Sequence, residues 1–173
     1  MSKIIGITFI IMIVLTSPAF SFRVSEEKEP IEGYTKLEMM DVDKITGSKM
    51  EGCVARIKGL RVIYDDGKIS YLLCVKVYLK GHPAFGISEV IFLIDNVRTI
   101  LKGNDYQLTK SDIALNDKMM EEIYCDVDTK LLEQLAEGKD VQFKIKGTYE
   151  YVAGKFPQGL QKQFGEFCKI CGI

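Results

Sequence analysis

The most uneven feature of the hydrophobic pattern is an apolar stretch at the start of the chain. Residues 4–15 are apolar except for one Gly and one Thr, and the only charge before them is Lys3. A basic residue, an apolar stretch and a small-residue ending at Ser21 are typical of a secretory signal peptide. Spanning a bilayer takes about 20 apolar residues, and no later stretch of the sequence reaches that length. We therefore predict a cleaved signal peptide over residues 1–21 rather than a membrane anchor.

The pattern changes abruptly after this stretch. Residues 22–33 are polar and acidic, and we predict a flexible leader there. The remaining residues, 34–173, are expected to form a single β-rich globular domain. Its first part is mixed, and the spacing of Leu37, Met40 and Ile45 suits a short helix.

The clearest alternation of apolar and polar residues flanks Asp66-Gly67. After this dipeptide, apolar residues occupy every second position, as in a half-buried strand. Asp-Gly between two such runs predicts a two-residue hairpin turn, with Tyr64 opposite Ile69. In that register the preceding strand changes phase beside Gly59, which predicts a β-bulge.

Five more strands follow from the same kind of pattern. A second hairpin is predicted at Asp95-Asn96, and another strand is predicted over residues 120–127. Further on, strict alternation predicts a half-buried strand with a partner after it. The inward side chains of this strand are Val141, Phe143 and Ile145, and the partner contains Tyr149 and Tyr151.

Two helices are predicted between and after these strands. Asp128 suits an N-cap and Gly138 a stop signal, so a short helix is expected over residues 129–137. A second helix begins near Pro157. Its apolar side chains form one stripe, made of Leu160, Phe164, Phe167, Cys168 and Cys171.

This order of elements predicts an α+β fold that is mostly antiparallel β. The sheet is expected to curl into a sandwich or an open barrel, with one short inserted helix and the C-terminal amphipathic helix packed on it. An all-β sandwich with peripheral helices is the alternative.

Composition and charge narrow the classes of function. Hydrophobic residues make up 47% of the chain and charged residues 27%, which excludes disorder as a global description. The net charge of −1 argues against a dedicated nucleic-acid binder. The single histidine, His82, excludes a multi-histidine metal site, and we expect neither a metal nor a cofactor.

Five cysteines in an exported chain predict disulfides, although five cannot all pair within one chain. Their connectivity stays open among Cys53, Cys74, Cys125, Cys168 and Cys171. Cys168 and Cys171 form a C-x-x-C motif, for which thiol–disulfide exchange is one interpretation. The motif lies at the C-terminal end of a predicted helix, where the helix dipole disfavours a thiolate. We therefore favour a structural role for this pair.

Aromatic and basic residues also alternate on predicted strands, and these residues are the candidates for a binding face. They are Tyr78, Lys76, Lys80, Lys144 and Lys146. Such a pattern on a sheet can stack bases or sugars, but lysines also protect the solvent side of ordinary strands. The lack of tryptophan and the negative net charge favour the ordinary strand, so no nucleic-acid partner is expected.

The sequence therefore favours an exported, non-catalytic module, periplasmic or extracellular, that binds a protein or an envelope component or has a structural role. The alternative is a thiol–disulfide exchange protein that uses Cys168 and Cys171. No transmembrane segment is expected after cleavage, and the sequence leaves the oligomeric state open.

Cleavage makes a direct prediction about the mature protein. The intact mass of the protein recovered outside the cytosol should correspond to an N-terminus near Phe22, because the small-residue site ends at Ser21. Recovery of the chain beginning at Met1 from the cytosol would contradict export.

Overall fold

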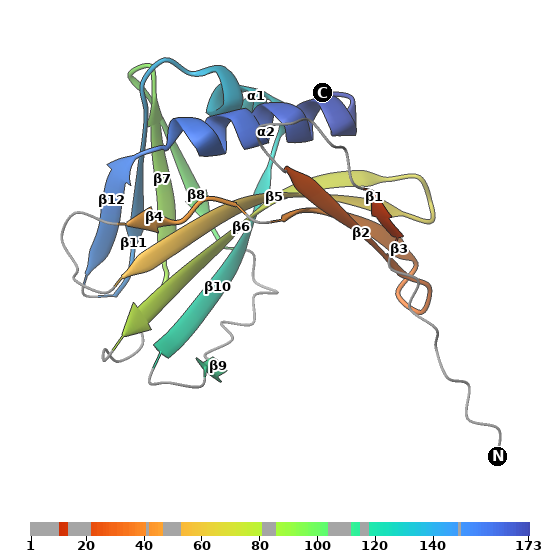
Figure 1. Ribbon diagram of the computed structural model, residues 1–173, viewed down its shortest axis with the longest axis horizontal. Helices are drawn as coiled ribbons and strands as arrows, with labels where there is room; N and C mark the ends of the chain where they lie inside the picture. The colour runs from red at the N-terminus through yellow and green to blue at the C-terminus, as the bar shows by residue number, and fades with distance from the viewer. Residues whose placement is uncertain are drawn as a thin grey trace.

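The computed structural model describes residues 11–13, 22–40, 42–46, 53–80, 86–103, 112–114, 118–148 and 150–173. Within these residues the chain forms two antiparallel sheets and two helices (Figure 1). The predicted α+β fold with antiparallel sheet is confirmed, and the sheets do not close into a barrel. The predicted signal peptide lies outside the described residues, except for the short strand β1 (Ile11–Ile13).

The larger sheet, sheet A, contains the long central strands of the molecule. Its order is β1, β2 (Arg23–Glu29), β3 (Tyr34–Met40), β5 (Val54–Tyr64), β6 (Ile69–Lys80), β10 (Lys118–Val127) and β9 (Asp112–Ala114). A two-residue strand, β4 (Ile45–Thr46), also pairs with β5.

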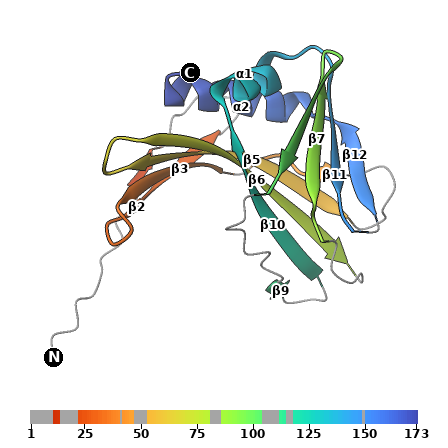
Figure 2. The ribbon, with the colours of Figure 1, turned by 180° about the vertical axis from the view of Figure 1, so that it is seen from behind.

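The smaller sheet, sheet B, lies behind sheet A in Figure 1 and in front of it in Figure 2. Its order is β12 (Tyr151–Lys155), β11 (Val141–Lys146), β7 (Glu89–Ile94) and β8 (Val97–Lys102). β8 approaches β10 and β12 approaches β4, so the two sheets come close at both edges. The core lies between the sheets and beneath α1 (Thr129–Glu137) and α2 (Gln158–Cys171).

The part of the chain after residue 21 is more regular than its sequence predicts. Arg23–Glu29 forms β2 and is not an irregular leader, because its backbone pairs with β3 along its whole length. Glu27 lies opposite Lys36 and forms an ion pair of 2.8 Å with it. The predicted short helix is also wrong, since Tyr34–Met40 forms strand β3, on which Met39 is fully buried in the core.

The β5–β6 hairpin is confirmed, but its turn contains three residues rather than two. Tyr64 donates its backbone N–H to the carbonyl of Lys68, over a distance of 2.9 Å. This leaves Asp65, Asp66 and Gly67 as the loop, and only Gly67 of the three has a positive φ, at 85°. The register therefore places Ile63, not Tyr64, opposite Ile69.

This shift by one residue removes the need for the predicted bulge at Gly59. The β5–β6 ladder runs without interruption, with Gly59 opposite Leu73. The change of phase has a different origin: β5 buries Ala55 and Ile57 on one face, and Leu60 and Val62 on the other. Both faces of β5 are therefore partly covered.

Gly59 instead provides the place where α2 rests on sheet A. A Cβ atom at this position would lie 2.8 Å from the ring of Phe167 and 3.1 Å from the sulfur of Met39. Only a residue without a side chain lets the Phe167 ring approach the strand so closely.

The remaining predicted elements agree well with the structure. The β7–β8 turn has positive φ at both Asp95 and Asn96, as its two-residue length requires. Asp128 caps α1 by accepting a hydrogen bond of 2.8 Å from the backbone N–H of Leu131. The predicted stripe of α2 is buried, together with Gln163, which the apolar pattern did not include. Tyr149, predicted on the partner strand, lies outside the described residues.

The close contact at Gly59 can be tested by mutation. Gly59→Ala should lower the free energy of unfolding by roughly 1–3 kcal/mol, because the added methyl overpacks against Phe167. Gly154→Ala is the matched control, since its added Cβ meets the Phe143 ring at an ordinary distance of 3.5 Å. Urea denaturation of both variants measures the difference. Equal stability of the two variants would contradict the close approach of α2 to β5.

Candidate functional site: the basic face of sheet B

Sheet B turns one face toward the core and the other toward solvent. Because side chains alternate along each strand, the inward set contains Val90, Phe92, Phe143 and Ile145, all of them buried. The register of the four strands arranges the outward residues in three rows of four. We call these outward residues the basic face: Lys102, Glu89, Lys146 and Tyr151; Ile100, Ile91, Lys144 and Ala153; Arg98, Leu93, Gln142 and Lys155.

The charge of the basic face is strongly one-sided. It contains five cationic side chains and a single carboxylate, although the whole chain has a net charge of −1. The carboxylate, Glu89, forms an ion pair of 2.9 Å with Lys146. The hydrogen bond and the charge of Lys146 lower the pKa of Glu89, with smaller contributions from Lys102 and Arg98. Glu89 is therefore ionised at neutral pH. At the edge of the face, Asp140 lies 3.6 Å from Lys155 and accepts a hydrogen bond from Gln142, so the excess of positive charge rests on Arg98, Lys102 and Lys144.

The centre of the basic face is apolar. Ile91 and Ile100 lie directly opposite each other on β7 and β8, and Leu93 follows Ile91 on the same side of β7. Ile100 is 45% exposed, and it lies between Arg98 and Lys102 along β8. Ile91 is only 9% exposed and Leu93 is half-buried, so Ile100 is the main exposed part of this apolar strip, which has cations on both sides of it.

Tyr151 adds an aromatic ring at one corner of the basic face. The Nζ atom of Lys144 lies 3.9 Å from the centroid of this ring, which is a close cation–π contact. Because Lys144 covers one side of the ring, Tyr151 is poorly placed to stack a base or a sugar on that side.

The predicted binding residues divide between two separate surfaces. Lys144 and Lys146 lie on the basic face of sheet B. Lys76 and Tyr78 lie on β6 of sheet A, where Lys76 pairs with Glu122 and the Tyr78 ring contacts Arg56. The backbone of Lys80 ends β6, but its side chain lies outside the described part of the chain.

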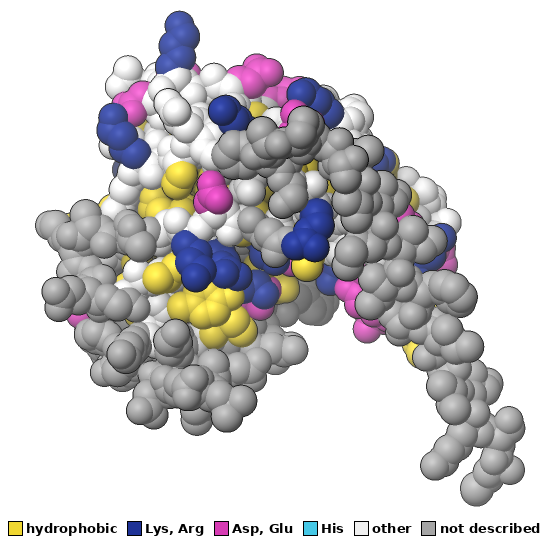
Figure 3. Space-filling view, in the orientation of Figure 1, with side chains coloured by type: hydrophobic (Ala, Val, Ile, Leu, Met, Phe, Trp, Pro, Cys, Tyr) yellow, Lys and Arg dark blue, Asp and Glu magenta, His cyan; other side chains and the backbone are white. Residues whose placement is uncertain are grey.

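Lys76 belongs to a polar network on the face of sheet A that points away from the core. Glu122 accepts hydrogen bonds from the Cys74 thiol at 2.9 Å and the Tyr124 hydroxyl at 2.5 Å, and Lys76 Nζ lies 3.0 Å from its second oxygen. Figure 3 shows the molecule in the orientation of Figure 1, and basic side chains are grouped there beside an apolar patch.

The network is neutralised internally. Burial by itself raises the pKa of Glu122, but the hydrogen bonds from Cys74, Tyr124 and Lys76 outweigh it and hold the pKa below its usual range. Burial and the neighbouring carboxylate raise the pKa of Cys74 and of Tyr124. The thiol and the phenol therefore stay protonated at neutral pH, which suits a structural network better than nucleophilic chemistry.

The disulfides expected from the sequence are absent, because all five cysteines are free and buried. Four of them, Cys53, Cys125, Cys168 and Cys171, occupy core positions as small apolar side chains, and Cys74 belongs to the Glu122 network. Cys53 and Cys74 belong to opposite faces of sheet A, because the residue that continues the ladder opposite Cys53 is Leu79, an odd number of positions from Cys74.

The C-x-x-C pair lies in the last turn of α2, as predicted. Burial raises the pKa of Cys168, and the carboxylates of Glu133 and Glu137 raise it further. Burial also raises the pKa of Cys171 to about 11, although the nearby Arg61 acts in the opposite direction. Neither thiol has the lowered pKa that thiol–disulfide exchange relies on.

Other classes of site find little support in the described residues. No group of three or more His, Cys, Asp or Glu side chains is placed there to hold a metal ion. None of the described helices is long and apolar enough to cross a membrane. His82 lies outside the described residues.

Comparison with known proteins adds nothing to this description: no family model, curated protein or solved structure matches the chain.

Proposed function

We propose that this protein is an exported, non-catalytic module that binds a partner protein through the basic face of sheet B. One observation carries the proposal: five cations surround an apolar strip on a regular, outward-facing sheet of a chain that is otherwise acidic. An apolar centre with a charged rim is the arrangement typical of protein–protein interfaces.

The chemistry of the basic face defines the kind of partner. Cations at its rim favour carboxylates, and the strip of Ile91, Leu93 and Ile100 favours an apolar surface rather than a solvated polyanion. Stacking of single-stranded nucleic acids or sugars uses accessible aromatic rings, whereas the one ring here lies beneath Lys144. The partner is therefore a protein surface with exposed apolar residues and acidic residues around them.

Export is the second part of the proposal. If cleavage follows Ser21, the mature chain begins with Phe22, which packs against the core, and β2 becomes the edge of sheet A. Burial of all five thiols protects them from oxidants outside the cytosol, so the fold does not depend on disulfides there.

Two changes on β8 together test binding through the basic face: a photo-crosslinking side chain at position 100, and charge reversal at positions 98 and 102. In the variant Ile100→benzoylphenylalanine, a photo-crosslinking side chain replaces an exposed residue of the apolar strip. Illumination of the producing cells should link this position to a protein partner. Arg98→Glu together with Lys102→Glu should reduce that adduct at least tenfold, because repulsion replaces attraction at the rim.

A matched control separates the site from the overall charge. Lys130→Glu together with Lys169→Glu makes the same change in net charge on the exposed sides of α1 and α2, and it should leave the adduct unchanged. An adduct that persists after charge reversal on β8, or that both pairs reduce equally, would contradict the proposal.

A further inference from the structure

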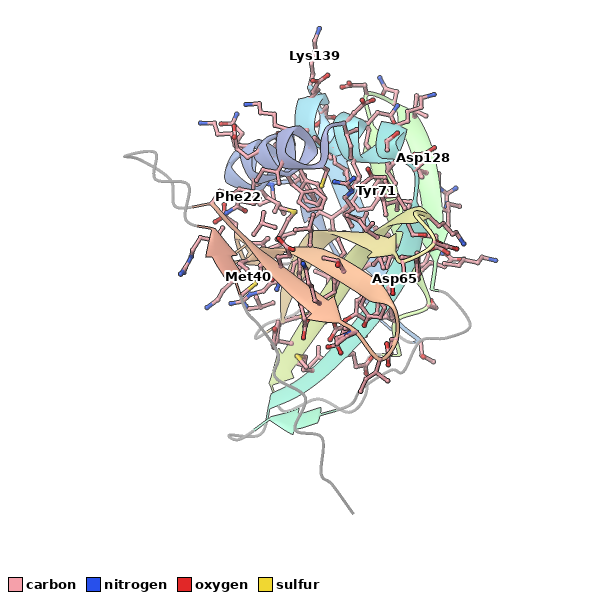
Figure 4. All side chains as sticks on the ribbon, turned by 90° about the vertical axis from the view of Figure 1, so that its right-hand side faces the viewer. Phe22, Met40, Asp65, Tyr71, Asp128 and Lys139 are labelled. Carbon is pink, nitrogen blue, oxygen red and sulfur yellow. The ribbon has the colours of Figure 1, made fainter. Side chains whose placement is uncertain are left out.

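The end of sheet A most distant from sheet B has a chemistry opposite to that of the basic face. It consists of two hairpin turns with their flanking residues, 29–34 and 64–69, which we call the hairpin end (Figure 1). The two turns are joined by a hydrogen bond of 2.9 Å from the backbone N–H of Asp65 to the carbonyl of Gly33. Figure 4 looks onto this end, with Asp65 labelled at its turn.

Apolar side chains are unusually exposed at the hairpin end. Ile31 is 95% exposed at the tip of the β2–β3 turn, and Ile69 and Tyr64 are 43% and 37% exposed. Tyr34 supports Tyr64 from the neighbouring strand through an edge-to-face contact of 6.4 Å between ring centroids. Contact of this kind holds the two rings in place without burying them.

Acidic side chains surround these apolar groups. Within the residues that define the hairpin end, Lys68 is the only cation, and the acidic residues are Glu29, Glu32, Asp65 and Asp66. The Lys68 ammonium lies 5.7 Å from the centroid of the Tyr64 ring. The hairpin end therefore presents the chemistry that the basic face selects: exposed apolar residues among carboxylates.

We propose that the partner of the basic face is the hairpin end of a second copy of this chain. This inference rests on the function proposed above and names the partner. Ile31 and its apolar neighbours would lie on the exposed Ile100 and the half-buried Leu93, while the acidic turns would meet the cations of β8 and β11.

The two surfaces match in width as well as in charge. The hairpin end spans the four neighbouring strands β2, β3, β5 and β6, and the basic face also spans four strands. With strands about 4.8 Å apart, both surfaces are about 14 Å wide between their outer strands. Because they lie at opposite ends of one chain, the contact is head-to-tail, and repetition produces a chain of subunits or a ring.

The size of the contact sets its strength. Including side chains, each surface is about 20 Å across, or about 400 Å² per partner, roughly half of a standard interface. Association should therefore be weak, concentration-dependent and sensitive to salt, since much of it depends on exposed charges.

Two variants that each damage one surface provide a sharp test. The tip variant, Ile31→Lys, changes a fully solvated side chain, and the face variant combines Arg98→Glu with Lys102→Glu. Sedimentation velocity in about 20 mM salt should show that the average mass of the unmodified protein rises with concentration, and that about 500 mM salt suppresses the rise. Each variant alone should remain monomeric, with an unchanged melting temperature.

Mixing the two variants distinguishes head-to-tail contact from every symmetric arrangement. The tip variant keeps its basic face and the face variant keeps its hairpin end, so an equimolar mixture should form one-to-one dimers and nothing larger. The pair Lys130→Glu and Lys169→Glu should associate like the unmodified protein.

Three results would overturn the inference. An unmodified protein that stays monomeric at every concentration, while Ile100 still crosslinks to another protein in cells, would reject self-association and leave the proposed function standing. Failure of the mixed variants to associate would reject the head-to-tail contact. Loss of both self-association and the Ile100 adduct would reject both proposals.

Discussion

The fold depends on a row of four aromatic side chains, Phe167, Phe164, Phe156 and Phe92, that connects the two sheets through α2. The row begins where the Phe167 ring rests on Gly59 of sheet A, at a distance that only glycine permits. On the same helix, Phe164 lies 5.7 Å from Phe156, and Phe156 lies 6.2 Å from Phe92 of sheet B, measured between ring centroids. Because the two sheets have few contacts at their edges, this row and the apolar core around it hold the sheets in one arrangement.

That arrangement decides which surfaces remain for other molecules. Once the inward side chains of sheet B face the row of rings, strict alternation leaves the basic face outside. Sheet A differs from sheet B in this respect. Its outward face carries ion pairs, such as Lys58 with Glu38, and the Glu122 network, so many of its charged side chains pair with one another. The basic face and the hairpin end each carry an excess of one sign of charge, and these are the two surfaces that we propose to meet.

The sequence was most informative where local rules determine the structure. The N-cap Asp128, the turn at Asp95-Asn96 and the stripe of α2 follow from neighbouring residues alone, and all three were predicted correctly. Predictions were wrong where partners distant in the sequence decide. β2 is a strand because its backbone pairs with β3 along its whole length, and Gly59 serves Phe167, more than 100 positions away, rather than a bulge. The basic face was found only in part, as Lys144 and Lys146, because its rows depend on the order of the strands.

The coupling of the two sheets through α2 can be measured directly by amide hydrogen exchange on Phe164→Ala. A buried Phe→Ala change typically costs about 3–5 kcal/mol. If the aromatic row joins both sheets into one cooperative unit, protection of the backbone N–H groups should fall by the same factor in β5 and β6 as in β7 and β11. Loss of protection in β7 and β11 alone, with β5 and β6 as well protected as in the unmodified protein, would contradict the account.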